Sequence, residues 1–274
     1  MTAATPRTYW LGAISSWGID LVKRGYEVAT LTSAYGITYG NAGNAYDLGN
    51  FDVFIVPEPN TVFSAAESTA IFNFVREGGG LVAVADHINY DRNGDGIDSP
   101  RIWNQLDAQR LWGVSFEVSG SHSNFTEVWS TNVSTDLSDS TIYGPEGTVN
   151  GLEFHDGTTM TLYPAVNPTV RGSVWRNGFA QGKSVAMAAP SVYGNGRIFF
   201  VGDRSPLDTR SPRCSRSSLT AYLTDPPPGL LMGNPRCQWR SQRSSSCPLA
   251  PRVTTASPPF REGPFHPPRL LSSA

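Results

Sequence analysis

Residues 79–107, GGLVAVADHINYDRNGDGIDSPRIWNQLD, contain the pattern that decides the fold. An uninterrupted apolar run over 81–85 is followed directly by Asp86 and His87, and then by an acidic loop punctuated with glycine. A Ser-Pro pair ends this loop, and proline is favoured at the first position of a helix. A buried strand that leads through a polar loop into a helix is typical of the carboxyl edge of an open α/β sheet, where ligands bind.

Outward from this stretch, helices and strands alternate along the chain. The spacing of Ser64 and Glu67 predicts a capping box, and the glycines at 78–80 end the helix that it starts. The apolar run FDVFIV at 51–56 predicts a strand buried on both faces. Apolar patterning further predicts helices at 15–25 and from 99 to about 112, and strands at 26–32, 184–189 and 197–201. Short connections between these elements favour right-handed crossovers and a mainly parallel sheet.

Between 113 and 180 the character of the sequence changes. Short β-type runs at 114–118, 127–133, 160–163 and 169–175 alternate with Gly, Asn, Ser and Asp. We therefore expect a β-rich, antiparallel insertion in the α/β domain.

Residues 204–274 differ in composition from the rest of the chain. They carry a formal net charge of +7 against −9 for 1–203, and they hold 13 of the 21 prolines and all three cysteines. Because this segment lacks apolar periodicity, we predict that it is disordered. Its arginines form no patch or motif, so nucleic-acid binding is not expected. No run in the chain approaches the ~18 apolar residues of a membrane-spanning helix.

Four polar side chains come just after predicted parallel strands: Glu58, Asp86, His87 and Asp203. Because the carboxyl ends of parallel strands meet at one edge of a sheet, we expect these side chains to converge. One histidine beside three carboxylates suits a general acid/base set or a site for a hard metal ion. The alternative is structural, since acids at strand ends also cap helices and fix loops.

The acidic loop resembles the opening of an EF-hand or dockerin calcium loop. Asp91, Asn93 and Asp95 supply oxygens at positions 1, 3 and 5, and a glycine follows. Position 12 is Ile102, which has no side-chain oxygen, so Asp98 would have to complete the site with different geometry. The alternative is an Asx- and glycine-rich turn without an ion.

Other catalytic signatures are weak or absent. His155, in LEFHDGTTM, lies near a strand start and could approach the edge site, although a structural hydrogen bond is the simpler interpretation. No G-x-S-x-G nucleophile elbow occurs, and neither a P-loop nor a G-x-G-x-x-G motif follows a strand. Nucleotide binding therefore has no support.

Five segments together carry a family resemblance: YDLGNFDVFIVPEPN, GGGLVAVADH, DRNGDGIDSPRIWNQL, LEFHDGTTMTLYPAVNPTVRG and GRIFFVGD. As a set, over about residues 8–203, they resemble bacterial proteins of the class I glutamine amidotransferase-like superfamily, within an often secreted branch. This resemblance implies a flavodoxin-like, three-layer α/β sandwich and an extracellular location. Amidotransferases place a cysteine nucleophile at the turn after a central strand. Here that turn holds Asp86 and His87, and residues 1–203 contain no cysteine, which excludes glutamine hydrolysis by that mechanism.

The same resemblance bears on both ends of the chain. Relatives begin with a strand ahead of the first helix, and after the last strand they continue into an acidic loop and a closing helix. We therefore expect that the domain, 1–203, lacks its first strand, and that a reading-frame slip near 203–210 produced residues 204–274. The amino terminus shows no signal-peptide pattern.

Three functions follow as hypotheses. The first is a ligand- or cation-binding module of a bacterial extracellular protein, for a small molecule or a carbohydrate. In it, Ca²⁺ is held by Asp91, Asn93, Asp95 and Asp98, and Glu58 and His155 contact the ligand. The second is a metal-assisted hydrolase that uses Asp86, His87 and Asp203. The third is an interaction domain whose acids are structural. The sequence leaves the oligomeric state open.

Overall fold

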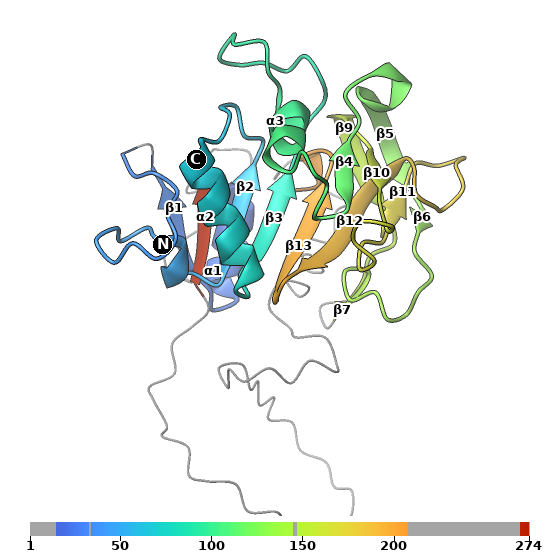
Figure 1. Ribbon diagram of the computed structural model, residues 1–274. Coiled ribbons are helices and arrows are strands. Elements are labelled where there is room, and N and C mark those ends of the chain that lie inside the picture. Colours follow the sequence, from blue (N-terminus) through green and yellow to red (C-terminus); the bar gives the residue numbers. More distant parts are fainter. Residues whose placement is uncertain (1–14, 33, 145–146, 208–268, 274) are drawn as a thin grey trace, which may run out of the picture.

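The computed structural model describes residues 15–32, 34–144, 147–207 and 269–273. In this part the chain forms an α/β fold dominated by one mixed sheet, with few helices (Figure 1). The helices are α1 (Ser15–Lys23), α2 (Ala65–Arg76) and α3 (Ser99–Leu106), with 3₁₀ turns η1 (Leu48–Asn50), η2 (Gly120–His122) and η3 (Ser205–Leu207). The strands of the main sheet are β1 (Glu27–Leu31), β2 (Val53–Pro57), β3 (Gly80–Val84), β4 (Val114–Phe116), β6 (Asn132–Val133), β10 (Met160–Leu162), β11 (Val174–Trp175), β12 (Ala186–Tyr193), β13 (Gly196–Val201) and β14 (Arg269–Ser273). Two small sheets pair β5 (Phe125–Ser130) with β9 (Leu152–Gly157), and β7 (Tyr143–Gly144) with β8 (Gly147–Thr148).

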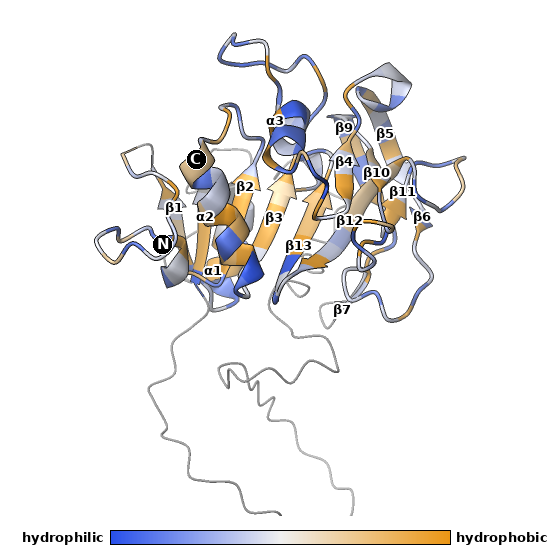
Figure 2. Ribbon diagram, viewed as in Figure 1, coloured by the Kyte–Doolittle hydropathy of each residue, from blue (hydrophilic) through white to orange (hydrophobic). Residues whose placement is uncertain are grey.

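The central part of the main sheet is parallel. Its order is β1-β14-β2-β3-β13-β12-β10-β4, and β1, β14, β2, β3 and β13 all run in the same direction. From β12 onward the neighbours pair antiparallel, and this part contains the predicted β-rich extension. The strands β2, β3 and β13 are the most apolar part of the sheet, as Figure 2 shows. All five residues of β3 are buried, as expected for a strand covered on both faces.

Different elements cover the two faces of the sheet. On one face, Phe74 and Val75 of α2 and Trp103 of α3 pack with Leu81. On the other, Trp17 of α1 lies in the same apolar cluster as residues of β2, β3 and the β5–β9 pair. The sheet is therefore covered on both sides, and its carboxyl edge faces the loops after β2, β3 and β13.

Local sequence signals predicted some helix ends and missed others. The capping box is confirmed, because Ser64 accepts the N–H of Glu67 and the Glu67 side chain accepts the N–H of Ser64. The helix α3 is shorter than predicted, and its N-cap is Asp98 rather than Ser99. It ends at Leu106 because the carboxylate of Asp107 accepts the N–H groups of the following turn.

The prediction that 204–274 is disordered throughout is wrong for residues 269–273. These residues form β14 between β1 and β2, where two consecutive leucines are enough to fill a position that is covered on both faces. Residues 204–207 are also ordered, and η3 packs against β9. The predicted frame slip, the three cysteines and any strand before α1 lie outside the described residues.

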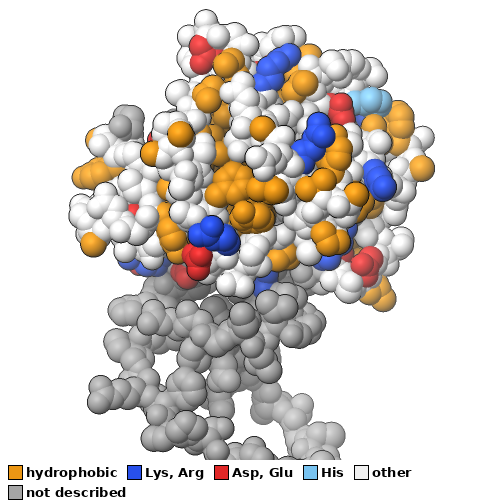
Figure 3. Space-filling model, in the orientation of Figure 1, with side chains coloured by type: hydrophobic (Ala, Val, Ile, Leu, Met, Phe, Trp, Pro, Cys, Tyr) orange, Lys and Arg blue, Asp and Glu red, His pale blue; other side chains and the backbone are white. Residues whose placement is uncertain are grey.

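The lengths of the described helices and the charge on one face of the molecule can be compared with the sequence-based expectations. No helix there is long and apolar enough to cross a membrane. On the face drawn in Figure 3, the Lys and Arg side chains are scattered singly among apolar and neutral residues.

Candidate functional site

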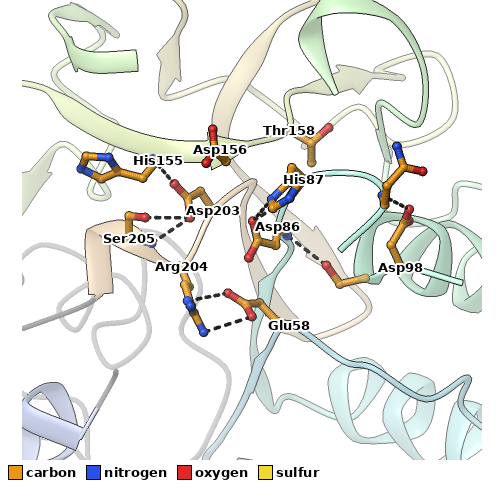
Figure 4. Close-up of polar contacts among 12 residues, drawn as sticks. Glu58, Asp86, His87, Asp98, His155, Asp156, Thr158, Asp203, Arg204 and Ser205 are labelled. Carbon is orange, nitrogen blue, oxygen red and sulfur yellow. Dashed lines mark hydrogen bonds and ion pairs between the residues drawn. The ribbon is translucent and has the colours of Figure 1, made fainter. Parts of the chain in front are cut away.

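Three carboxyl groups meet at the carboxyl edge of the sheet (Figure 4). Glu58 directly follows β2, Asp86 comes just after β3, and Asp203 comes just after β13. These three strands are consecutive neighbours in the parallel sheet, so their ends lie together. All three residues are buried, with exposed fractions of 5%, 6% and 1%. The sequence-based prediction that these acids converge thus agrees with the geometry.

Asp86 and His87 form a hydrogen-bonded pair. The ring Nδ1 of His87 lies 2.8 Å from Oδ1 of Asp86, and the backbone N–H of His87 donates to the same oxygen at 2.7 Å. The backbone N–H of Asp86 donates to the hydroxyl of Ser99, which ties the strand end to α3. The His87 ring also packs against Tyr90, with ring centroids 5.1 Å apart. The contact through Nδ1 fixes the orientation of the imidazole relative to Asp86.

Glu58 is held in an unusual backbone conformation between two arginines. Its φ is +44°, in the left-handed region that residues other than glycine rarely adopt. The NH2 of Arg92 lies 3.0 Å from its Oε2, and the Nε of Arg204 lies 2.9 Å from its Oε1. Within the described residues, the buried Oε1 nevertheless accepts no hydrogen bond of good geometry. Each carboxyl oxygen of Glu58 thus lies within 3.0 Å of an arginine nitrogen.

The pKa of Glu58 is raised from 4.5 to about 8, with burial as the largest cause and the charge of Asp86 and a hydrogen bond with it as further causes. The two arginines act in the opposite direction and lower the pKa, but they do not outweigh burial. Glu58 therefore carries a proton at neutral pH.

The pKa of Asp203, which follows the strand on the other side of β3, is also raised. Its carboxylate accepts the N–H of His155 at 2.5 Å, and the N–H and hydroxyl of Ser205 at 2.9 and 3.0 Å. Its pKa is raised to about 7: burial is the largest cause and the charge of Asp86 adds to it, while the hydrogen bonds from Ser205 and His155 act to lower the pKa. The edge site therefore holds carboxyl groups that are poised to exchange protons near neutrality.

His155 reaches this site through its backbone and not through its ring. The ring Nε2 lies 2.5 Å from Oε1 of Glu153, the side chain is 59% exposed, and Figure 4 shows it pointing away from Asp203. Strand β9 still approaches closely, because a Cβ added at Gly157 would lie 2.8 Å from the Cβ of Asp203. The structure thus brings His155 beside the carboxyl edge but does not direct its imidazole there.

The acidic loop after β3 is organised by its own hydrogen bonds. The Asp91 carboxylate accepts the N–H groups of Gly94, Asp95 and Gly96, the last at 2.6 Å. The Asn93 amide donates to Asp95 and to the carbonyl of Asn60.

The fourth predicted ligand, Asp98, is committed elsewhere. It is 1% exposed, caps α3 through the N–H of Arg101 and forms an ion pair with the guanidinium of that residue. In the described ranges, no group of three or more His, Cys, Asp or Glu side chains is placed so that it could hold a metal ion.

Two residues of the site were missed by the sequence-based prediction: Arg92 and Arg204. Arg204 directly follows Asp203 at the end of a strand, a position that could have singled it out. Arg92 lies among the acids of the loop, where the sequence alone gives no signal that it contacts Glu58. Its guanidinium also lies over the ring of Tyr90, 5.3 Å from the centroid.

Comparisons with known proteins give no family. No family model matches the chain, and no curated protein matches it. Among solved structures, the chain is similar to the N-terminal domain of mmIFT52, with 14% identity, a TM-score of 0.46, and coverage of 65% of this chain and 80% of that chain. It is also similar to the cytoplasmic protein STM3548 from Salmonella typhimurium, with 12% identity, a TM-score of 0.44, and coverage of 64% and 72%. A β-galactosidase from Bacillus circulans sp. alkalophilus has 11% identity and a TM-score of 0.36, and the match covers 65% of this chain and 23% of that chain. Likenesses at these TM-scores carry no argument about function.

Proposed function

We propose that the carboxyl edge of the sheet binds a small, hydroxyl-rich ligand of the carbohydrate class through Glu58, Asp86 and Asp203. One observation carries the proposal: three buried carboxyl groups converge from three strand ends, and two of them have raised pKa values. A protonated carboxyl group both donates and accepts hydrogen bonds, which suits sugar hydroxyls. Buried acids with raised pKa values cost stability, and such groups cluster at functional sites.

A buried acid with a purely structural role is expected to have a lowered pKa, and Asp47 of the same chain is an example. Asp47 is also buried, but Thr38, Gly40, Asn41 and Gly49 donate hydrogen bonds to its carboxylate. Burial acts to raise the pKa of Asp47, yet these bonds outweigh burial and lower it. At Glu58 the arginines, and at Asp203 the hydrogen bonds, also act to lower the pKa, but there burial outweighs them. This difference from Asp47 favours ligand binding over loop fixation.

Hydrolysis is the second candidate, and the Asp86–His87 pair favours it. The 2.8 Å contact orients the imidazole so that its Nε2 can take a proton from a water molecule. Protonated Glu58 can in turn donate its proton to the leaving oxygen of an ester or a glycoside. A test is the hydrolysis of aryl esters and aryl glycosides: His87→Ala should abolish turnover, whereas turnover unchanged in this variant would exclude the role.

With α1 and α2 on opposite faces of a parallel central sheet, a flavodoxin-like sandwich of the class I glutamine amidotransferase-like superfamily remains our proposal for the fold. An extracellular location belongs to the same proposal and rests on the resemblance alone.

Calcium binding remains a separate proposal for the loop around Asp91, Asn93 and Asp95. The loop is closed by the 2.6 Å hydrogen bond from Gly96 to Asp91, five residues apart, so these side chains are held on one short turn. The engagement of Asp98 with Arg101 argues against a fourth ligand from that position.

Saturation-transfer NMR with a panel of common mono- and disaccharides tests the binding proposal. We expect at least one sugar to bind the full chain, and Glu58→Gln and Asp86→Asn to weaken this binding at least ~10-fold, or about 1.4 kcal/mol. Glu77→Gln is a matched control, since Glu77 is an exposed glutamate at the far end of α2. Failure of every sugar, or equal binding by the variants, would reject the proposal.

A further inference from the structure

Strand β14 lies in the position between β1 and β2, here called the slot, and it joins these two strands. It lies between β1 and β2 and is drawn in red in Figure 1. It pairs in parallel with β1 along five residues, from Glu27 opposite Arg269 to Leu31 opposite Ser273. On its other side it pairs with Val53 and the two residues after it. Among the described strands β1 pairs with β14 alone, so β1 joins the sheet through this segment.

The slot recognises the first residue of the strand in several ways. The guanidinium of Arg269 meets the carboxylate of Glu27 through two contacts, each 3.0 Å long. The guanidinium also lies over the ring of Phe51, 5.5 Å from the centroid. The backbone N–H of Arg269 donates to the carboxylate of Asp52 at 2.7 Å. A bidentate arginine–carboxylate pair of this kind gives geometric specificity as well as attraction.

The next two residues fill both faces of the slot. Leu270 is 3% exposed and belongs to the apolar cluster that includes Trp17 of α1. Leu271 is fully buried and belongs to the opposite cluster, which includes Leu31. The alternation of side chains along a strand thus places one leucine on each face. The slot therefore selects an extended segment that begins Arg-Leu-Leu.

We propose that this slot is a strand-acceptor site that also takes the Arg269–Ser273 segment of a second copy of the chain. The contacts that hold β14 between β1 and β2 are all made by residues 269–273 and by no other part of the C-terminal segment that the structure describes. Arg269 and its partner Glu27 are 242 positions apart in the sequence, so the contact is not a local one. A segment supplied by another copy would make the same contacts, as in strand addition and domain swapping. This inference is independent of the function proposed for the carboxyl edge.

The segment 269–273 belongs to the same chain as its slot, and this covalent link sets the protein concentration at which exchange between chains can be detected. A tethered segment has an effective concentration of roughly 1 mM or less. A second copy therefore competes as the protein approaches this concentration, and the exchanged form increases with protein concentration.

Interchain disulfide trapping in the full chain tests the proposal. Thr30 and Ser272 are register partners in β1 and β14, and Thr30 is exposed. One chain carries Thr30→Cys and a differently tagged chain carries Ser272→Cys, and in both chains the native cysteines at 214, 237 and 247 are replaced by serine. A Thr69→Cys chain, with an exposed cysteine on α2, measures random collision when it is mixed with the Ser272→Cys chain.

We expect mixed Thr30→Cys and Ser272→Cys chains to form a disulfide-linked heterodimer, at least ~10-fold above the Thr69→Cys background and increasing with protein concentration. The double variant Thr30→Cys/Ser272→Cys reports whether the slot is filled within one chain. Efficient cross-linking in the double variant with no heterodimer up to about 1 mM would overturn exchange. No cross-linking in either experiment would show that β14 does not occupy the slot, and it would overturn the proposal as well.

Discussion

Replacing Glu58 with glutamine should make the chain more stable at neutral pH, because the folded chain buries a carboxyl group that it cannot easily ionise. The pKa of Glu58 rises from 4.5 to about 8, with burial as the largest cause. Below about pH 4.5 the group is protonated in both the folded and the unfolded chain. As the pH rises, the unfolded chain loses this proton first, so the free energy of unfolding falls until about pH 8.

The size of this loss of stability follows from the difference between the pKa values of Glu58 in the unfolded and the folded chain. Each pH unit between the two pKa values changes the free energy of unfolding by about 1.4 kcal/mol. At pH 7 the accumulated loss is about 3 kcal/mol, and it approaches its full size near pH 8. Glutamine has nearly the shape of a protonated glutamate but does not ionise. The advantage of Glu58→Gln over the unchanged chain should therefore be about 3 kcal/mol larger at pH 7 than at pH 4.5.

Urea unfolding followed by tryptophan fluorescence at these two pH values measures the difference. The control Glu77→Gln changes an exposed side chain, and we expect it to alter the unfolding free energy by less than about 0.5 kcal/mol at either pH. If Glu58 instead stabilises the fold through Arg92 and Arg204, Glu58→Gln will destabilise the chain at pH 7. That result would show that the raised pKa of Glu58 does not determine its effect on stability.

Three further predictions concern stability elsewhere in the chain. Ser64→Ala removes the capping box of α2 and should lower the free energy of unfolding by about 1 kcal/mol, whereas Thr69→Ala in the same helix should have a smaller effect in the same urea titration. Leu271→Ala removes a fully buried side chain from β14 and should cost about 2–5 kcal/mol; a change below about 0.5 kcal/mol would show that this strand is not in the sheet. If the acidic loop binds calcium, millimolar calcium should raise the melting temperature of the unchanged chain but not that of Asp91→Ala, and equal melting with calcium and with chelator would remove calcium from the account.

The position of the edge site could be predicted from sequence because it follows from chain direction. Once 51–56, 81–85 and 197–201 are taken as parallel strands, Glu58, Asp86 and Asp203 must lie at one edge. The capping box at Ser64 was equally accessible, since it depends on residues only three positions apart.

Three features of the structure could not be predicted from the sequence, because they depend on how side chains and segments meet in the folded chain. The ring of His155 lies beside Glu153, two residues earlier on β9, and only its N–H reaches Asp203, which is 48 positions away. The pairing of Arg92 and Arg204 with Glu58 joins three separate loops. Strand β14 escaped prediction because a five-residue segment with two leucines has no periodicity to detect, and its place is fixed by the slot between β1 and β2.

Sugar binding as proposed requires that the carboxyl edge of the sheet holds protonated acids near neutral pH. A ¹³C NMR titration of the Asp and Glu side-chain carboxyl groups in the full chain tests this claim most directly, with Glu58→Gln and Asp203→Asn assigning the signals. We expect two carboxyl groups to titrate unusually late, with pKa values of about 8 for Glu58 and about 7 for Asp203. Titration of both groups below about pH 5, as for ordinary carboxylates, would contradict this expectation.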